Sequence, residues 1–152
     1  MAIRSHNRVE VLHGVNFDVL GERDRVIYGG FTLPELEVRI KRFAKDLGLE
    51  VRFFQTNHEG EFVEHLHRLP KIADAAIINA GAWTHYSWAI RDAFDFTGVP
   101  AVEVHLSDIS KREEWRRRSV FEGLETILGR VHGKGPDGYR EALELISTRL
   151  GE

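Results

Sequence analysis

Two pairs of residues in this chain have the types needed to move protons. Glu103 and His105 alternate within the segment EVH, so their side chains share one face if this segment is a strand. A carboxylate beside an imidazole fixes the tautomer of the ring and raises its basicity, which suits a general acid or base. Arg23 and Tyr28 lie in one loop-like segment, and an arginine next to a tyrosine favours the phenolate, a competent base for a proton beside a carbonyl. Their spacing alone does not bring the two side chains together.

A third set of residues is suited to holding a small anion. Arg112 and Arg116 are spaced i, i+4 and point the same way if their stretch is helical, and arginine binds carboxylates through two parallel hydrogen bonds. His85 and Asp92 are seven residues apart and are predicted to share a face of one helix. The net charge of the chain is −3, so an anionic substrate needs a local cluster of this kind.

The elements that must position these residues alternate between strands and helices. Strands are predicted over residues 8–12, 49–54, 75–78, 100–104 and 126–131, and helices over 33–47, 59–69, 84–96 and 135–150. Thr32 and Glu35 form a capping-box pattern, Gly48 is a C-cap glycine, and the second helix is predicted to end before Pro70. Residues 14–30 lack clear periodicity, and an irregular loop of this length is often functional.

This order predicts one flavodoxin-like α/β domain over residues 1–152. Five parallel strands would form the central layer of a three-layer fold, with the strand order 2-1-3-4-5. In such sheets ligands bind beyond the carboxyl ends of the strands. Functional residues are therefore expected just after Leu12, Phe54, Ile78 and Val104.

Several polar and aromatic residues also have ordinary structural interpretations. Asn57 and Asp108 are at least as typical of turn or helix caps as of a binding site. A lone histidine at a strand end is more often structural than catalytic. Trp83, Trp88 and Trp115 favour packing or a subunit interface over stacking on a ligand.

Other chemistries lack their motifs. The chain has no cysteine, which excludes disulfides, thiolate metal sites and a cysteine nucleophile. It has no P-loop, no G-x-G-x-x-G and no G-x-S-x-G, and His65 and His67 do not form an HExxH-type metal site. No apolar run is long enough to span a membrane, and residues 1–7 lack the apolar core of a signal peptide, which fits a cytoplasmic protein. Neither a metal, a nucleic acid nor a membrane is therefore predicted as a partner.

Four blocks of the sequence form a recognisable pattern: LHGVNFDVLGERDRVIYG at 12–29, QTNHEGEF at 55–62, INAGAWTHYSWAIRDA at 78–93 and VPAVEVHLSDISKREEWRRRS at 99–119. In this order and spacing the chain resembles the type II 3-dehydroquinate dehydratases. The resemblance implies removal of water from 3-dehydroquinate, a small anion, to give 3-dehydroshikimate. The family proceeds by anti elimination through an enolate without a metal or cofactor, and it assembles trimers into dodecamers.

The resemblance also implies a role for each matching residue. Tyr28 would be the base that takes the C2 proton, with Arg23 holding it ionised. Asn16 would orient a water that stabilises the enolate oxygen. His105 would protonate the departing C1 hydroxyl, with Glu103 orienting it. The residues that would bind the hydroxyls and carboxylate of the substrate are Asn79, His85, Leu106, Ser107 and Arg116. Asp92 would reach a site across a subunit boundary, and Arg112 would belong to the loop that closes over substrate.

The chain departs from the family pattern close to these residues. The usual N-G-P-N turn is His13-Gly14-Val15-Asn16 here, which brings a titratable group near the site and removes the proline that stiffens the turn. Further departures are Asp18, Arg25, Tyr86, Trp88, Asp108 and the stretch after Ser119, where the following strand is unusually polar. These changes bear on substrate identity and on the subunit contacts.

Two alternatives therefore stay open beside the dehydratase. One is a diverged enzyme acting on a related cyclic hydroxy-keto acid, and the other is a non-enzymatic flavodoxin-like module that binds a nucleotide or a regulatory anion. The retained set of Asn16, Arg23, Tyr28, Glu103 and His105 favours elimination chemistry. The sequence does not distinguish aromatic amino acid biosynthesis from quinate catabolism.

Overall fold

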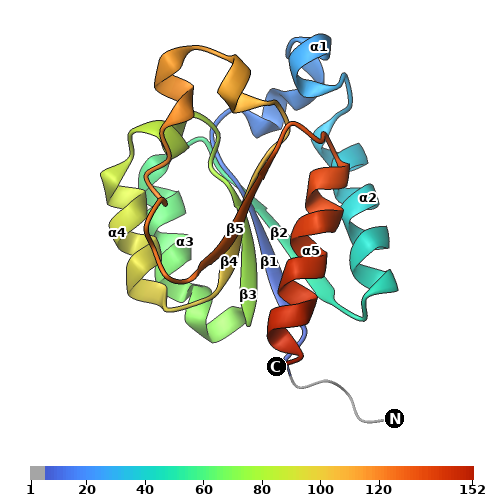
Figure 1. Cartoon of the computed structure of the whole chain (residues 1–152), viewed down its shortest axis with the longest axis vertical. Coiled ribbons are helices and arrows are strands. Elements are labelled where there is room, and N and C mark those ends of the chain that lie inside the picture. Colours follow the sequence, from blue (N-terminus) through green and yellow to red (C-terminus); the bar gives the residue numbers. More distant parts are fainter. Residues whose placement is uncertain (1–5) are drawn as a thin grey trace.

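The computed structural model describes residues 6–152, which form a parallel sheet between two layers of helices (Figure 1). The strands are β1 (Arg8–His13), β2 (Glu50–Gln55), β3 (Ala75–Asn79), β4 (Ala101–His105) and β5 (Ile127–His132). All neighbouring strands pair in parallel, in the order β2-β1-β3-β4-β5. The predicted flavodoxin-like α/β fold and its strand order are confirmed.

Each face of the sheet packs against its own pair of helices. The four long helices are α2 (Leu33–Asp46), α3 (Glu59–Ile72), α4 (Trp88–Thr97) and α5 (Asp137–Leu150). In Figure 1, α2 and α5 cover one face and α3 and α4 the other. Successive residues of β1 therefore enter different cores, with Val11 on the α2/α5 side and Leu12 on the α3/α4 side. Every residue of β3 is buried, as expected of a strand covered on both faces.

The start of α2 agrees with its sequence signals. The Thr32 hydroxyl accepts a hydrogen bond from the Glu35 N–H at 3.3 Å, and the Glu35 carboxylate accepts one from the Thr32 N–H at 3.4 Å. This reciprocal pair is the predicted capping box, and it is confirmed. Just after the helix, Gly48 has a φ of 70°, in the left-handed region that glycine tolerates best.

The helix α3 continues through Pro70, so its predicted end before this proline was wrong. Pro70 lies in the last turn, where its missing N–H removes a single helical bond. Leu69 is fully buried, and its carbonyl accepts the Ala73 N–H at 3.0 Å. Burial of this last turn outweighs the lost bond.

Residues 84–96 do not form one helix, and that prediction was also wrong. A 3-10 turn, η2 (Gly81–His85), ends at His85, and α4 begins at Trp88. The break follows from Ser87, whose hydroxyl accepts the Ile90 N–H at 3.1 Å and caps α4 at its first residue. His85 and Asp92 therefore do not share a helix face: His85 is buried, whereas Asp92 is exposed on α4.

The predicted loop over residues 14–30 contains two short helices, η1 (Phe17–Glu22) and α1 (Arg25–Tyr28). Phe17 and Leu20 anchor η1 in the α2/α5 core, and the Asp24 carboxylate caps α1 by accepting two backbone N–H groups at 2.9 and 3.2 Å. After β4 come two more short turns, η3 (Ile109–Lys111) and η4 (Glu114–Arg117). These short elements lie at the carboxyl edge of the sheet, at the top of Figure 1.

Within residues 6–152, no helix is both long and apolar enough to cross a membrane.

Candidate active site

A narrow cavity of about 100 Å³ lies among the short elements at the carboxyl edge of the sheet. Of the residues predicted from the sequence, those lining it are Asn16, Arg23, Tyr28, Asn79, His85, His105, Leu106, Ser107, Arg112 and Arg116. Four lining residues were not predicted: Phe17, Gly81, Ala82 and Ile109. Their side chains have no catalytic or polar groups, so the sequence gives no reason to select them, and they line the cavity only because of their position in the fold.

The tyrosine oxygen in this cavity lies between two guanidinium groups. Arg23 donates a hydrogen bond to the Tyr28 oxygen at 2.8 Å, and Arg112 donates a second at 2.9 Å. The Arg23 guanidinium also lies 3.9 Å from the centre of the Tyr28 ring. Arg112 donates in addition to the Ser107 hydroxyl at 3.3 Å. Two cationic donors on one oxygen stabilise negative charge there.

Arg112 and Arg116 reach the cavity without forming one helix. Arg112 follows η3, and Arg116 belongs to η4, so the helical spacing considered from the sequence does not apply. Arg116 pairs with Glu113 and lies 4.1 Å from the centre of the Trp115 ring. These contacts hold a third guanidinium, in addition to those of Arg23 and Arg112, in the lining of the cavity.

His105, which also lines the cavity, is bonded to a buried carboxylate. The His105 Nε2 donates to Glu103 Oε2 at 2.6 Å, and the Ser119 hydroxyl donates to Glu103 Oε1 at 2.7 Å. Burial raises the pKa of Glu103, but the hydrogen bonds and charges of His105, Arg130 and Ser119 outweigh burial and leave this pKa below its usual value. Glu103 is thus an ionised orienting group that lies behind His105 and does not line the cavity.

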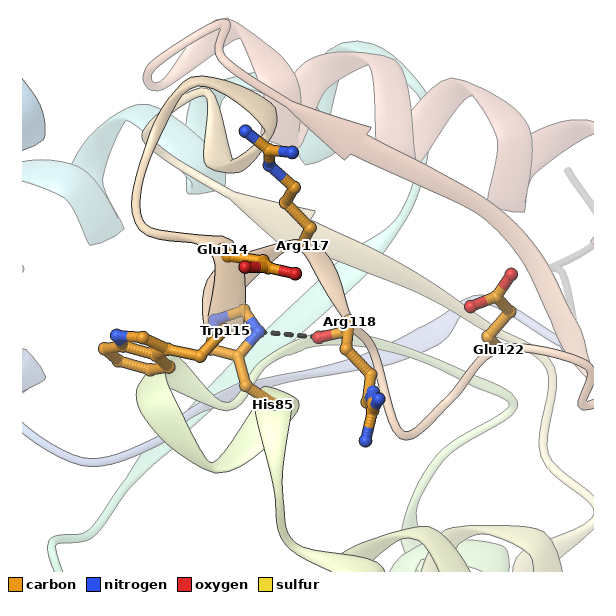
Figure 2. Close-up of a pocket in the computed structure, with 6 residues that line it drawn as sticks. All are labelled: His85, Glu114, Trp115, Arg117, Arg118 and Glu122. Carbon is orange, nitrogen blue, oxygen red and sulfur yellow. Dashed lines mark hydrogen bonds between the residues drawn. The ribbon is translucent and has the colours of Figure 1, made fainter.

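The ring of His85 lies beside that of His105, with 6.0 Å between their centres. Its Nδ1 donates to the Arg118 carbonyl at 2.7 Å, the bond drawn in Figure 2. Burial lowers the pKa of His85, and the neighbouring charges of His105 and Arg116 lower it further. Neutral His85 with its proton on Nδ1 leaves Nε2 as an acceptor.

A wider hollow of about 760 Å³ adjoins the cavity on the outer side of His85 (Figure 2). It is lined by His85, Glu114, Trp115, Arg117, Arg118 and Glu122. Its charged lining residues are two glutamates and two arginines, so opposite charges are mixed there. Neither Tyr28 nor the Glu103–His105 pair lines this hollow. The acid–base chemistry therefore belongs to the narrower cavity.

The turn before Asn16 is held firmly although it lacks a proline. Asn16 has a φ of 72°, and its backbone N–H donates to the Asn57 side chain at 2.8 Å. Asn57 in turn donates to Asp18 at 2.9 Å. A Cβ at Gly14 would lie 2.2 Å from the Ala80 carbonyl oxygen, so only glycine fits there. The turn-supporting interpretation of Asn57 is confirmed.

His13, the unusual residue of this turn, does not add a charge to the site. It is fully buried, and its Nε2 lies 2.9 Å from the Tyr139 oxygen. Burial lowers the pKa of His13 to about 3, so the ring is neutral at ordinary pH. The Tyr139 oxygen also accepts a hydrogen bond from Asn79 at 3.0 Å, which links His13 to a residue that lines the cavity.

Two further predicted features lie outside the cavity. Asp92 is exposed on α4 and does not line the cavity of its own chain. Asp108 caps η3 by accepting the Ser110 N–H at 3.1 Å, and it lies 3.1 Å from His132. Its interpretation as a cap is confirmed, and its charge is directed to these partners.

The fold and the site together define an α/β enzyme of the flavodoxin-like kind, with a tyrosine–arginine group and the histidine of a histidine–carboxylate pair lining one cavity. The family described as Dehydroquinase class II matches residues 7–147, and the chain belongs to this family.

Individual relatives agree with the family match over nearly the whole chain. The 3-dehydroquinate dehydratase of Thermotoga maritima is 48% identical over 145 residues, covering 95% of this chain and 98% of the relative. That of Syntrophotalea carbinolica is 48% identical over 144 residues, covering 94% and 96%. The crystal structure of type II dehydroquinase from Butyrivibrio crossotus superposes with a TM-score of 0.87 at 35% identity, covering 97% of this chain and 99% of the other. A 3-dehydroquinate dehydratase-like protein from Bifidobacterium longum gives 0.67 at 30% identity, covering 96% and 99%.

Proposed function

We propose that this enzyme removes water from 3-dehydroquinate to give 3-dehydroshikimate, as a hydro-lyase of the shikimate pathway. The observation that carries the proposal is the Tyr28 oxygen held between Arg23 and Arg112, in the same cavity that His105 of the Glu103–His105 pair lines. This arrangement suits the abstraction of a proton beside a carbonyl group, followed by protonation of a leaving hydroxyl. The names of relatives that match 95% of the chain support the same substrate.

In the first step, the Tyr28 phenolate takes the C2 proton of the substrate, and the electrons of the C–H bond move onto the carbonyl oxygen as an enolate. The bonds from Arg23 and Arg112 support this role, because they stabilise negative charge on the tyrosine oxygen before the reaction. Asn16 orients a water that stabilises the enolate oxygen. That assignment is supported by its position in the cavity wall and by the fixed backbone of its turn.

In the second step, protonated His105 gives its proton to the C1 hydroxyl. The C1–O bond breaks, the enolate collapses to form the C1–C2 double bond, and water leaves. The ionised Glu103 carboxylate supports this role, because it orients the ring through Nε2 and leaves Nδ1 to deliver the proton. Tyr28 and His105 come from different strand ends, as an anti elimination across a ring requires.

Substrate recognition is assigned to the other groups that line the cavity with Tyr28 and His105. His85 accepts a hydrogen bond from a substrate hydroxyl through Nε2, and Arg116 contacts the carboxylate. The remaining binding groups in this assignment are Asn79, Leu106 and Ser107. Arg112 completes the site by closing its segment over substrate, which excludes water from the enolate.

The proposal extends to a homo-oligomer of trimers that assemble into a dodecamer. Asp92 then acts in the cavity of a neighbouring subunit, which is supported by its exposed position on α4. Two large aromatic side chains near it, Tyr86 and Trp88, are 57% and 58% exposed. Exposed aromatic groups of this size are enriched at subunit interfaces. In this proposal the chain is one catalytic domain that acts in the cytoplasm. It serves aromatic amino acid biosynthesis or quinate catabolism.

The test is turnover of 3-dehydroquinate, followed by the ultraviolet absorbance of the conjugated product, with a Tyr28→Phe variant beside the wild type. We expect turnover by the wild type and a loss of kcat on the order of 10³-fold or more in the variant, with substrate binding retained. Folded wild-type protein without turnover would contradict the proposed substrate. Near-normal kcat in the variant would instead remove Tyr28 as the base.

The two alternatives are not favoured. A diverged dehydratase would keep the acid–base pair but turn over a related hydroxy-keto acid faster than 3-dehydroquinate in the same assay. A non-enzymatic flavodoxin-like module would bind flavin or nucleotide and turn over neither. The family match and the relatives named 3-dehydroquinate dehydratase weigh against both.

A further inference from the structure

The carboxylate that orients His105 has a second cationic partner, on the edge strand of the sheet. Glu103 on β4 pairs in register with Arg130 on β5. The Arg130 Nε lies 3.2 Å from Glu103 Oε2, the same oxygen that accepts the His105 Nε2 hydrogen bond at 2.6 Å. Arg130 does not line the cavity and cannot touch a substrate bound there. The influence of Arg130 on the reaction is therefore expected through the Glu103–His105 pair that its charge adjoins.

We propose that Arg130 is a positioning residue for the acid half of the site, which sets how strongly the Glu103 carboxylate holds the proton on His105. This inference rests on the proposed function, because it assigns Arg130 to the step in which His105 gives up a proton.

The charges of the three groups decide the direction of this effect. An ionised carboxylate alone stabilises a protonated imidazole, which makes it harder for His105 to release its proton. A permanent positive charge on the same carboxylate oxygen offsets part of that stabilisation. Arg130 therefore weakens the hold of Glu103 on the His105 proton, and it helps to keep Glu103 ionised in a position where only 2% of the carboxylate side chain is exposed.

Among the residues that the structure describes, Arg130 is the one cation on this carboxylate besides His105. Within residues 6–152, the ion pairs of Glu103 are those with His105 and Arg130. The other groups that face the pair come from η2, η4, β5 and the segment after η4: His85, Arg116, His132 and Ser119. Of these, Ser119 is an uncharged donor, and the others have their own partners in Arg118, Glu113 and Asp108.

The experiment measures kcat and KM against pH for variants of Arg130. Arg130→Met removes the charge at similar length, Arg130→Gln removes it but keeps a donor, and Arg130→Lys retains it. The matched control is Arg52→Met: Arg52 also lies on an edge strand of the same sheet, and its nearest carboxylate, Glu50, is 3.9 Å away and exposed. Two neutral variants are used so that the test still works if one of them, Arg130→Met or Arg130→Gln, does not fold.

We expect the alkaline limb of the kcat profile to move up by about 0.5 to 1 pH unit in both neutral variants, because protonated His105 becomes more favourable. Where His105 stays protonated, kcat should fall by less than the roughly 3- to 10-fold factor that this shift represents, with KM unchanged, because a weaker acid expels the hydroxyl more slowly. Arg130→Lys should restore most of the wild-type profile, and Arg52→Met should leave it unchanged. Alkaline limbs that coincide in all variants, or an equal shift in Arg52→Met, would overturn the proposal.

A second measurement separates this inference from the proposed function. Histidine ring signals of the free protein, assigned with a His105→Asn variant, give the titration midpoint of His105 without any substrate. A midpoint that rises by the same 0.5 to 1 pH unit in Arg130→Met supports the role of Arg130 even in a protein that fails to turn over 3-dehydroquinate. An unchanged midpoint refutes that role even in a protein with full activity.

Discussion

His13 ends β1 in a fully buried position, and within residues 6–152 its one polar side-chain partner is the neutral hydroxyl of Tyr139. No carboxylate is bonded to it, in contrast to His105 at the end of β4. Burial therefore acts alone and lowers the pKa of His13 to about 3. In the unfolded chain this histidine recovers an ordinary pKa near 6.5, so its protonation couples to unfolding.

The sign of this coupling leads to a prediction about stability. Because the folded-state pKa is lowered, the unfolded chain binds more protons, and the contribution of His13 is fully present above about pH 6.5 and falls as the pH drops toward 3. In wild-type protein the unfolding free energy should therefore decline by up to about 1.4 kcal/mol per pH unit below pH 6 from this group alone. His13→Asn should make the decline shallower, as measured by urea unfolding between pH 4 and 7. Parallel wild-type and variant curves would contradict this account.

Other residue contacts show what spacing in the sequence can and cannot predict. The Glu103–His105 bond follows from the alternation of side chains along one strand, and it was predicted. The bond between Tyr28 and Arg112 joins residues 84 positions apart, and no local pattern indicates it. Arg130 was seen only as part of an unusually polar strand. Its contact depends on the register between two strands, which side-chain types alone do not determine.

At the scale of elements, the strand order and the four long helices were predictable, whereas two helix boundaries were not, and one of these, the start of α4, follows His85. Alternating apolar segments specify a parallel sheet covered on both faces. In contrast, the predicted end of α3 and the predicted continuous helix over residues 84–96 were wrong. Each boundary depends on how one local signal balances against burial or capping. In α3, the helix continues past Pro70 despite the signal to end there, whereas before α4 the cap supplied by Ser87 starts a new helix.

The cap of α4 therefore has a functional consequence that the cap of α2 lacks. Ser87 ends the break that follows His85, whereas Thr32 caps a helix whose start lies away from the cavity. Replacing either by alanine should destabilise the fold by about 0.5 to 2 kcal/mol, the usual cost of a lost N-cap. Only Ser87→Ala should also raise KM, because His85 shifts with the break. Thermal melts and steady-state kinetics of both variants check this, and an unchanged KM in Ser87→Ala would separate the cap from the site.

At the scale of the whole molecule, the proposed role of Asp92 makes each site the product of two subunits. Asp92→Ala and Tyr28→Phe should each be nearly inactive alone, because each removes one half of every site. In mixed oligomers, some sites combine an intact Tyr28 with an intact Asp92 from the neighbour. Random co-assembly at equal amounts should restore about a quarter of the sites.

The measurement is activity after the two variants are unfolded together and refolded, with each variant refolded alone as the control. Size-exclusion chromatography of the same samples reports whether they assemble. Assembled mixtures that stay inactive would show that Asp92 does not act across a boundary, and a monomer with full activity would remove the shared site altogether.

The Tyr28 oxygen, held by arginines from two separate surface segments, also affects how the enzyme fails. Tyr28 itself lies in the short helix α1, which contains no buried residue, whereas the sheet is sealed between two apolar layers. Thinly packed segments of this kind open well before a sealed core does. Tyr28, the proposed base, keeps both arginine partners only while these surface segments are in place, so mild heat or dilute denaturant should stop turnover in a molecule whose sheet is still intact. Turnover then reports whether the short segments at the carboxyl edge of the sheet are folded, and inactivation need not mean that the whole protein has unfolded.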